Sequence, residues 1–212
     1  MGVSVVVGAL ADLIGDDEEG ADWFREELVA INQLLELNNL PPHSEPEKLP
    51  ALNNRTYVDS YPYSFIHYLR RVYANWSLDP EWVAVPVAEG ESPTDDPAIE
   101  KTSDSTSSHL LCHSDAEGFY LPIKFSEVLL DDTDQVSGYM VGSSYALLEE
   151  LISIAFIFGI QLTDGELSDV EVERIIKEID AEGVFFIEKI VWLSLFEAAR
   201  LSIAHKTVIQ FT

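Results

Sequence analysis

Side chains of metal-binding types gather in the middle of the sequence, between residues 109 and 117. They are His109, Cys112, His113, Asp115 and Glu117. If this stretch is a strand, His109 and His113 lie about 13 Å apart at ~3.3 Å per residue, whereas the ligands of one ion lie within ~2.0–2.3 Å of it. Only His113, Asp115 and Glu117, placed in a turn, could converge on one ion. We favour the alternative of a structural hairpin with an acidic turn, and we predict neither a metal nor a cofactor.

The same stretch contains the residue types of a catalytic triad, His113, Ser114 and Asp115. Triad members meet through the fold, and the side chains of consecutive residues diverge, so this run does not form a triad. The sequence has no Gly-x-Ser-x-Gly elbow and no glycine-rich phosphate loop. We therefore predict no catalytic residue, and an enzyme is the less favoured interpretation.

A second group of polar residues lies on one side of a predicted helix. His67, Arg70 and Arg71 are spaced i, i+3 and i+4, so they share a helix face. They could bind an anion or a carboxylate; alternatively, the arginines pair with acidic residues of the fold. We expect the turn to lie near this face, with Asp115 paired to Arg70 or Arg71. The candidate ligand-binding residues are therefore His67, Arg70, Arg71, His113, Asp115 and Glu117.

The elements that must position these residues follow from apolar spacing and turn residues. The hairpin would pair residues 110–112 with residues 119–123 across the acidic turn. Helices are predicted over residues 22–38, 62–76, 145–158, 168–183 and 184–204. The helix over residues 145–158 is apolar all round in its second half, so we expect it at the centre of the core. The sequence thus predicts the α+β class: mostly helical, with a small antiparallel sheet containing a hairpin near residues 109–124.

The length of 212 residues fits a single domain over residues 1–212. Within it, residues 89–108 are acidic and rich in Ser, Thr, Asp and Pro. This composition is typical of segments that bury little apolar surface. We predict that residues 89–108 form a mobile acidic loop.

The charge of the chain limits its partners. It has 12 Lys and Arg against 38 Asp and Glu, a formal net charge of −26. A surface this negative repels nucleic-acid phosphates and anionic lipids, so we expect no nucleic-acid partner and no membrane partner. It attracts basic proteins and cations instead, and association of identical chains stays open.

Localisation is indicated by cysteine content and by the N-terminal sequence. A single cysteine excludes an internal disulfide. The first residues lack the basic region and the long apolar segment of a secretion signal. The longest apolar run, residues 151–160, is shorter than the ~18 residues of a membrane span. We therefore expect a cytoplasmic protein.

Three segments carry a resemblance to a known group of proteins. They are Tyr61-Pro-Tyr-Ser-Phe-Ile-His-Tyr-Leu-Arg-Arg71, His109-Leu-Leu-Cys-His-Ser-Asp-Ala-Glu-Gly-Phe-Tyr-Leu-Pro122 and Val141-Gly-Ser-Ser-Tyr-Ala-Leu-Leu-Glu-Glu150. The chain resembles small, acidic, uncharacterised bacterial proteins that have no assigned activity. The resemblance implies a bacterial cytoplasmic protein and supplies no mechanism.

Three hypotheses for the function remain. The leading one is an acidic binding protein for a basic protein partner, resembling an inhibitor or an immunity protein; it explains the charge and the lack of catalytic motifs. The alternative is an enzyme or small-ligand binder with a pocket between the 113–117 turn and the face of His67, Arg70 and Arg71. The third is adaptation to high salt, for which the 47% hydrophobic content gives partial support.

Overall fold

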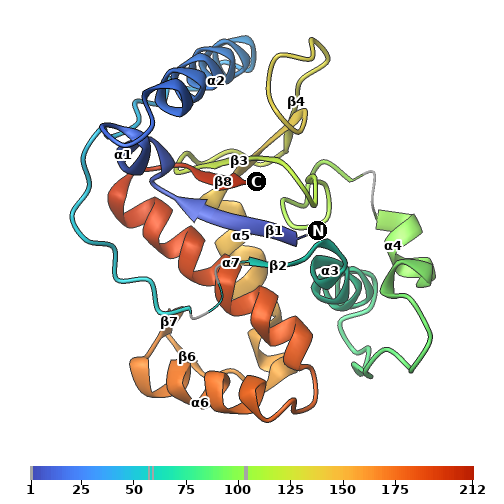
Figure 1. Cartoon of the computed structure of the whole chain (residues 1–212). Coiled ribbons are helices and arrows are strands. Elements are labelled where there is room, and N and C mark those ends of the chain that lie inside the picture. Colours follow the sequence, from blue (N-terminus) through green and yellow to red (C-terminus); the bar gives the residue numbers. More distant parts are fainter. Residues whose placement is uncertain (1, 57, 59, 103–104) are drawn as a thin grey trace.

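The protein is built around a six-stranded mixed sheet with helices on both faces (Figure 1). The computed structural model describes residues 2–56, 58, 60–102 and 105–212. The strands, in sheet order, are β2 (Ser60–Pro62), β1 (Gly2–Val7), β8 (Ile209–Phe211), β3 (Gly118–Leu121), β5 (Met140–Ser143) and β4 (Leu129–Leu130). All neighbours pair antiparallel except β3 and β5, which are parallel. A separate hairpin is formed by β6 (Leu162–Thr163) and β7 (Glu166–Leu167).

Helices make up most of the regular structure, which confirms the predicted α+β class. The α-helices are α1 (Ala9–Leu13), α2 (Glu18–Leu37), α3 (Tyr63–Leu78), α4 (Pro97–Thr102), α5 (Ser144–Ile154), α6 (Asp169–Asp180) and α7 (Phe186–His205). Two 3₁₀ turns are η1 (Pro93–Asp95) and η2 (Ala155–Phe158). Among the described residues, none of the helices has both the length and the apolar character needed to cross a bilayer.

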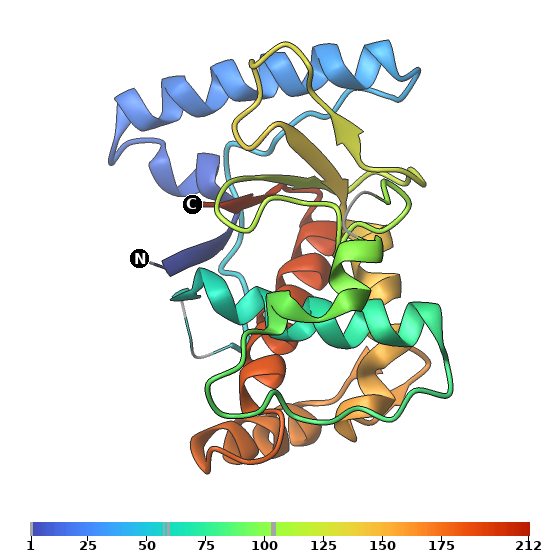
Figure 2. The ribbon, with the colours of Figure 1, turned by 90° about the vertical axis from the view of Figure 1, so that its right-hand side faces the viewer.

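The alternation of side chains along the strands creates two cores, one on each face of the sheet. In β3, Tyr120 points to the core shared with α3, α5 and α7. Its neighbours Phe119 and Leu121 point to the opposite core, which α1 and α2 cover. Figure 2 shows the result: α2 runs along one side of the sheet, and α3, α5 and α7 lie on the other. Helix α2 is therefore an outer layer with one free face.

The most enclosed helix is α7 and not the 145–158 helix that the sequence placed at the centre. Trp192 of α7 is fully buried, and its Nε1 donates to the carbonyl of Leu151 at 2.8 Å. Glu197 of α7 is also 0% exposed, because Arg55 and Arg200 bind its carboxylate from both sides. The predicted 145–158 helix is divided into α5 and the 3₁₀ turn η2, and Phe156 of that turn is exposed.

The predicted hairpin near residues 109–124 has one strand, β3, where two were expected. A turn stands in place of the first arm. The backbone N–H groups of His109 and Leu110 in this turn donate to the carboxylate of Glu150 at 2.9 and 2.7 Å. Strand β3 pairs instead with β5 and β8. Partners distant in the sequence therefore replace the local pairing that the pattern of residues 110–112 suggested.

The predicted loop at residues 89–108 contains η1 and α4. Ala98 of α4 packs with Ala74 of α3 and with Leu111, so part of this stretch is anchored to the fold. Residues 103–104 of the predicted loop lie outside the described residues. The mobility of the segment stays a prediction.

Candidate functional site

The structure brings the 113–117 turn against α3, as the sequence predicted, but with a different partner for the aspartate. Asp115 Oδ2 lies 2.9 Å from His67 Nε2. Both side chains are partly exposed. Burial lowers the pKa of His67, the positive charge of Arg70 lowers it further, and Asp115 acts in the opposite direction. The expected pairing of Asp115 with an arginine was wrong. The negative charge of Asp115 nevertheless acts to raise the pKa of Arg70, which burial lowers.

Arg70 is buried and binds the backbone of the segment that leads into the turn. Its Nε donates to the carbonyl of Leu110 at 2.8 Å, and its Nη2 donates to the carbonyl of His113 at 2.6 Å. These carbonyls would need strand partners in a hairpin. Arg70 therefore holds the 109–114 segment in its non-strand conformation.

Arg71 binds a different segment. Its Nε donates to Asp96 Oδ2 at 3.0 Å, its Nη1 donates to the carbonyl of Val85 at 3.0 Å, and its guanidinium lies 5.6 Å from the centre of the Trp82 ring. Asp96 precedes α4, so Arg71 ties the stretch before α4 to α3. Both adjacent arginines are thus occupied by structural contacts.

His113 is buried and stacks on Tyr120, with ring centroids 4.1 Å apart. Burial lowers the pKa of His113 to about 4, so the ring is neutral at pH 7. Glu117 is exposed at the end of the same turn. Within the described ranges, no group of three His, Cys, Asp or Glu side chains could hold a metal ion. A ligand-binding role for the six residues stays a prediction.

The charged residues of the chain are segregated between inside and outside. All six arginines are buried or half-buried, and each donates to a carboxylate or a backbone carbonyl; they are Arg25, Arg55, Arg70, Arg71, Arg174 and Arg200. Most of the acidic side chains are exposed. Arg25 is the most exposed of them, with 40% of its side chain exposed, and pairs with Asp22 on the outer face of α2 at 2.7 Å. Because most of the other contacts lie within the fold, the outer surface presents mainly carboxylates, with a few lysines among them.

The densest group of these carboxylates lies on the first half of α2. They are Glu18, Glu19, Asp22 and Glu26, whereas the adjacent Glu27 is buried. Residues 18–26 span about 12 Å of helix axis and include one cation, Arg25. The outer face therefore carries roughly one net negative charge per 4 Å, close to the ~3.4 Å axial spacing of phosphates along one strand of B-DNA.

Local interactions explain why such a charged segment is helical. Asp17 caps α2, accepting a hydrogen bond from the N–H of Gly20 at 3.0 Å. Carboxylates in the first turn are stabilised by the helix dipole. On the inner face, Phe24 packs edge-on against Phe119 of β3 at 6.0 Å, and Ile31 is fully buried. Each such side chain contributes about 1.5–3 kcal/mol on burial, which offsets the repulsion among the outer carboxylates.

A second acidic segment, the loop between β4 and β5, lies beside α2 (Figure 2). The N–H and hydroxyl of Ser137 both donate to Glu27, at 3.0 and 2.7 Å. This loop exposes Asp132 and Asp134. The buried Asp131 holds the loop by accepting hydrogen bonds from Thr133 and from backbone N–H groups. Burial acts to raise the pKa of this carboxyl, but these hydrogen bonds outweigh that effect and lower the pKa to about 2. Asp131 is therefore ionised at pH 7.

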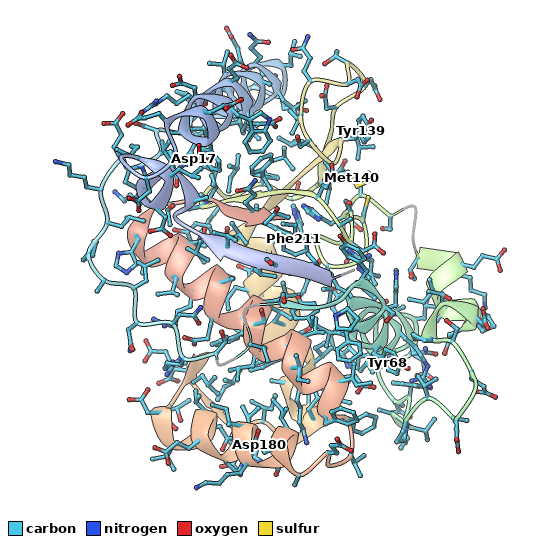
Figure 3. All side chains as sticks on the ribbon, viewed as in Figure 1. Asp17, Tyr68, Tyr139, Met140, Asp180 and Phe211 are labelled. Carbon is cyan, nitrogen blue, oxygen red and sulfur yellow. The ribbon has the colours of Figure 1, made fainter. Side chains whose placement is uncertain are left out.

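The 113–117 turn touches the same loop. Gly138 has a φ of 78°, and a Cβ there would lie 2.6 Å from the carbonyl oxygen of Glu117, so glycine permits the close approach. Next to it, Tyr139 is 53% exposed, and hydrogen bonding to Asp134 raises its pKa. Figure 3 shows Asp17 and Tyr139 at the same end of the molecule. We define the acidic surface as Glu18, Glu19, Asp22, Glu26, Glu117, Asp132 and Asp134.

Sequence reasoning identified the overall charge but did not choose α2 as the site. The signal was present in the spacing: Glu19, Asp22 and Glu26 stand at i, i+3 and i+7, which places them on one helix face. The contribution of Asp132 and Asp134 could not be found this way, because it depends on the contact between Ser137 and Glu27.

Comparison with known proteins gives one match. A family model described as "Putative DNA-mimic protein" matches residues 1–211. No curated protein and no solved structure matches the chain. The family match covers nearly the whole sequence and agrees with the group of exposed carboxylates on α2. The chain therefore belongs to this DNA-mimic family.

Proposed function

We propose that the protein binds a basic DNA-binding protein through the acidic surface and occupies the site that would otherwise hold DNA. The observation that supports this most is the first half of α2, where the net charge of the exposed residues approaches that of one DNA strand in density. Lysine and arginine side chains that bind phosphate also bind carboxylate, and arginine does so through the same paired donors. A row of carboxylates at a spacing close to that of phosphates can therefore replace a row of phosphates.

The segregation of charge supports the same proposal. An inhibitor of this kind must attract its target from a distance, and a surface of one sign accelerates encounter with an oppositely charged partner. Most of the arginines, which would weaken this field at the surface, are engaged within the fold, as in the contact of Arg55 and Arg200 with buried Glu197. Arg25 of α2 is the exception, because it pairs with the exposed Asp22. This arrangement favours a binding protein whose charge serves recognition.

The narrower parts of the proposal come from the sequence. We infer an inhibitor-like or immunity-like protein of the bacterial cytoplasm that does not itself bind nucleic acid, because phosphates would be repelled by the −26 charge. The alternative, a ligand pocket at the 113–117 turn, has less support. Arg70, Arg71 and His113 all direct their polar atoms to groups of the fold.

A competition experiment tests the proposal. The immobilised protein is exposed to a bacterial lysate freed of nucleic acid, and bound basic proteins are then challenged with duplex DNA or with polyglutamate at matched charge concentration. The proposal predicts that duplex DNA releases the bound proteins and that polyglutamate is much less effective. Equal release by the two polymers would indicate a generally acidic surface, and release by neither polymer would contradict DNA mimicry.

A further inference from the structure

A groove lies along the second half of α2, beyond the carboxylates. Its volume is about 490 Å³, and it is lined by Val29, Asn32, Gln33, Glu36, Leu40 and Pro42. Val29 is 58% exposed and the nearby Leu37 is 76% exposed. Apolar side chains left open beside a groove indicate an interaction surface more often than isolated ones do. The outer face of α2 thus changes from acidic to partly apolar along its length.

The groove continues the line of carboxylates. Asp22, Glu26 and Val29 stand at i, i+4 and i+7 of one helix, so their side chains share one face. At 1.5 Å per residue, Val29 lies about 4.5 Å along the axis from Glu26. A partner that lies on the carboxylates of the first half therefore reaches the groove without a change of direction.

The far wall of the groove is held in place by hydrogen bonds. Asn32 of α2 donates to the carbonyl of His43 at 3.0 Å and accepts from its N–H at 2.7 Å. The ring of His43 lies 2.6 Å from the buried carboxylate of Glu45, which also accepts from the N–H of Val208 at 3.0 Å. The connector that carries Leu40 and Pro42 is thereby fixed to α2 and to the sheet, so the groove exists before any partner binds.

We propose that this groove receives an aliphatic side chain of the same basic protein whose cations contact the acidic surface. The inference rests on the proposed function. Its occupant is indicated by charge complementarity along one continuous helix face: the cations of the partner meet Glu26 and also Asp22, which is already paired with Arg25 at 2.7 Å, and a neighbouring apolar side chain enters beside Val29. Glu36, on the rim of the groove, favours a further cation next to that apolar residue.

The two halves of α2 then contribute differently to binding. Attraction between exposed charges weakens as salt shortens the screening length, whereas burial of an apolar side chain does not weaken with salt. A DNA phosphate backbone offers no groove of this kind, so the apolar contact distinguishes this protein from DNA. It selects, among basic proteins, those with an apolar residue beside their cations.

Matched peptides test the inference. The probes are a series of lysine-rich helical peptides of identical charge. Each peptide carries one leucine, at a position that differs from peptide to peptide. Each has a counterpart with serine in place of that leucine. We expect all peptides to bind at low salt. At ~0.5 M salt, at least one leucine peptide should retain about tenfold tighter binding than its serine counterpart, an effect of the size expected for burying one such side chain.

Two variants locate the effect. Val29→Gln should remove the leucine advantage and leave binding at low salt unchanged, because it alters no charge. Val170→Gln is the control: Val170 is 78% exposed on α6, at the other end of the molecule (Figure 1). Unchanged thermal unfolding of both variants establishes that they fold.

The outcomes separate this inference from the proposed function. Salt-sensitive binding of all peptides with no leucine advantage, or an advantage that survives in Val29→Gln, overturns the groove and leaves electrostatic mimicry intact. Absence of binding by every peptide at low salt contradicts the proposed function as well.

Discussion

Ser137 donates two hydrogen bonds to Glu27, one from its backbone N–H at 3.0 Å and one from its hydroxyl at 2.7 Å. Glu27 belongs to α2, and Ser137 belongs to the loop that exposes Asp132 and Asp134. Because Glu27 is mostly buried, both of its oxygens need donors. This contact makes the helix and the loop parts of one acidic surface.

We predict that Ser137→Ala loosens the loop. The substitution removes one donor to a buried carboxylate, so the free energy of unfolding should fall by about 1–3 kcal/mol. Amide hydrogen exchange in residues 131–139 should rise more than exchange in β3. Ser64→Ala, at an exposed site on α3, is the control and should stay within about 0.5 kcal/mol of the original protein. Equal effects of the two substitutions would show that the Ser137 contact does not hold the loop.

Arg70 and Asp115 should differ sharply in their effect on stability. Arg70→Lys cannot reach the carbonyls of Leu110 and His113 together, since an ammonium lacks the forked donors. We expect a loss of about 1.5–3 kcal/mol in the free energy of unfolding, measured by denaturant titration. Asp115→Ala removes only a partly exposed pair with His67 and should cost about 0–1 kcal/mol. The reverse order would mean that the turn is held by Asp115 and that Arg70 is available for a ligand.

Glu150 should give the protein an unusual pH dependence. Burial raises the pKa of this carboxyl to about 7, although backbone N–H groups of Leu110 and His109 act to lower it. Between the ordinary pKa and about 7 the folded state binds more protons than the unfolded state, so this group makes stability fall as pH rises. Glu150→Gln should remove that fall, on the order of 2–3 kcal/mol between pH 5 and 7.5. Parallel curves for the two proteins would refute the assignment.

The sequence identified the helices well, because the residues that cap a helix and set its apolar face lie close together in the chain. Ser168, where the sequence predicts the start of a helix, accepts from the N–H of Glu171 at 3.2 Å and caps α6. The helix predicted over residues 22–38 begins earlier, at Glu18, since Asp17 caps it. In both cases the deciding residues lie within four positions of the helix end.

The sheet and the site could not be predicted in the same way. The neighbours of β3 are β5 and β8, distant in the sequence, and the backbone of residues 109–114 is held by Arg70 and Glu150 from about forty residues away. The periodicity of neighbouring residues does not indicate contacts between segments so far apart in the sequence. The single-domain organisation of residues 1–212 remains a prediction, which one cooperative unfolding transition would support.

The central claim is that the carboxylates of α2 replace DNA phosphates. Two double variants with the same loss of charge test it: Glu19→Gln with Glu26→Gln on α2, and Glu173→Gln with Asp180→Asn on α6. All four residues are exposed, and Asp180 lies at the end of the molecule away from Asp17 (Figure 3). Net charge is therefore matched, and only its location differs.

The measurement is the displacement of a labelled DNA duplex from a DNA-binding protein recovered in the competition experiment. If α2 is the contact, the α2 variant should need on the order of tenfold more protein to displace the duplex, corresponding to about 1.4 kcal/mol, and the α6 variant should behave like the original protein. Equal losses in the two variants would show that net charge alone drives binding, which would contradict the account.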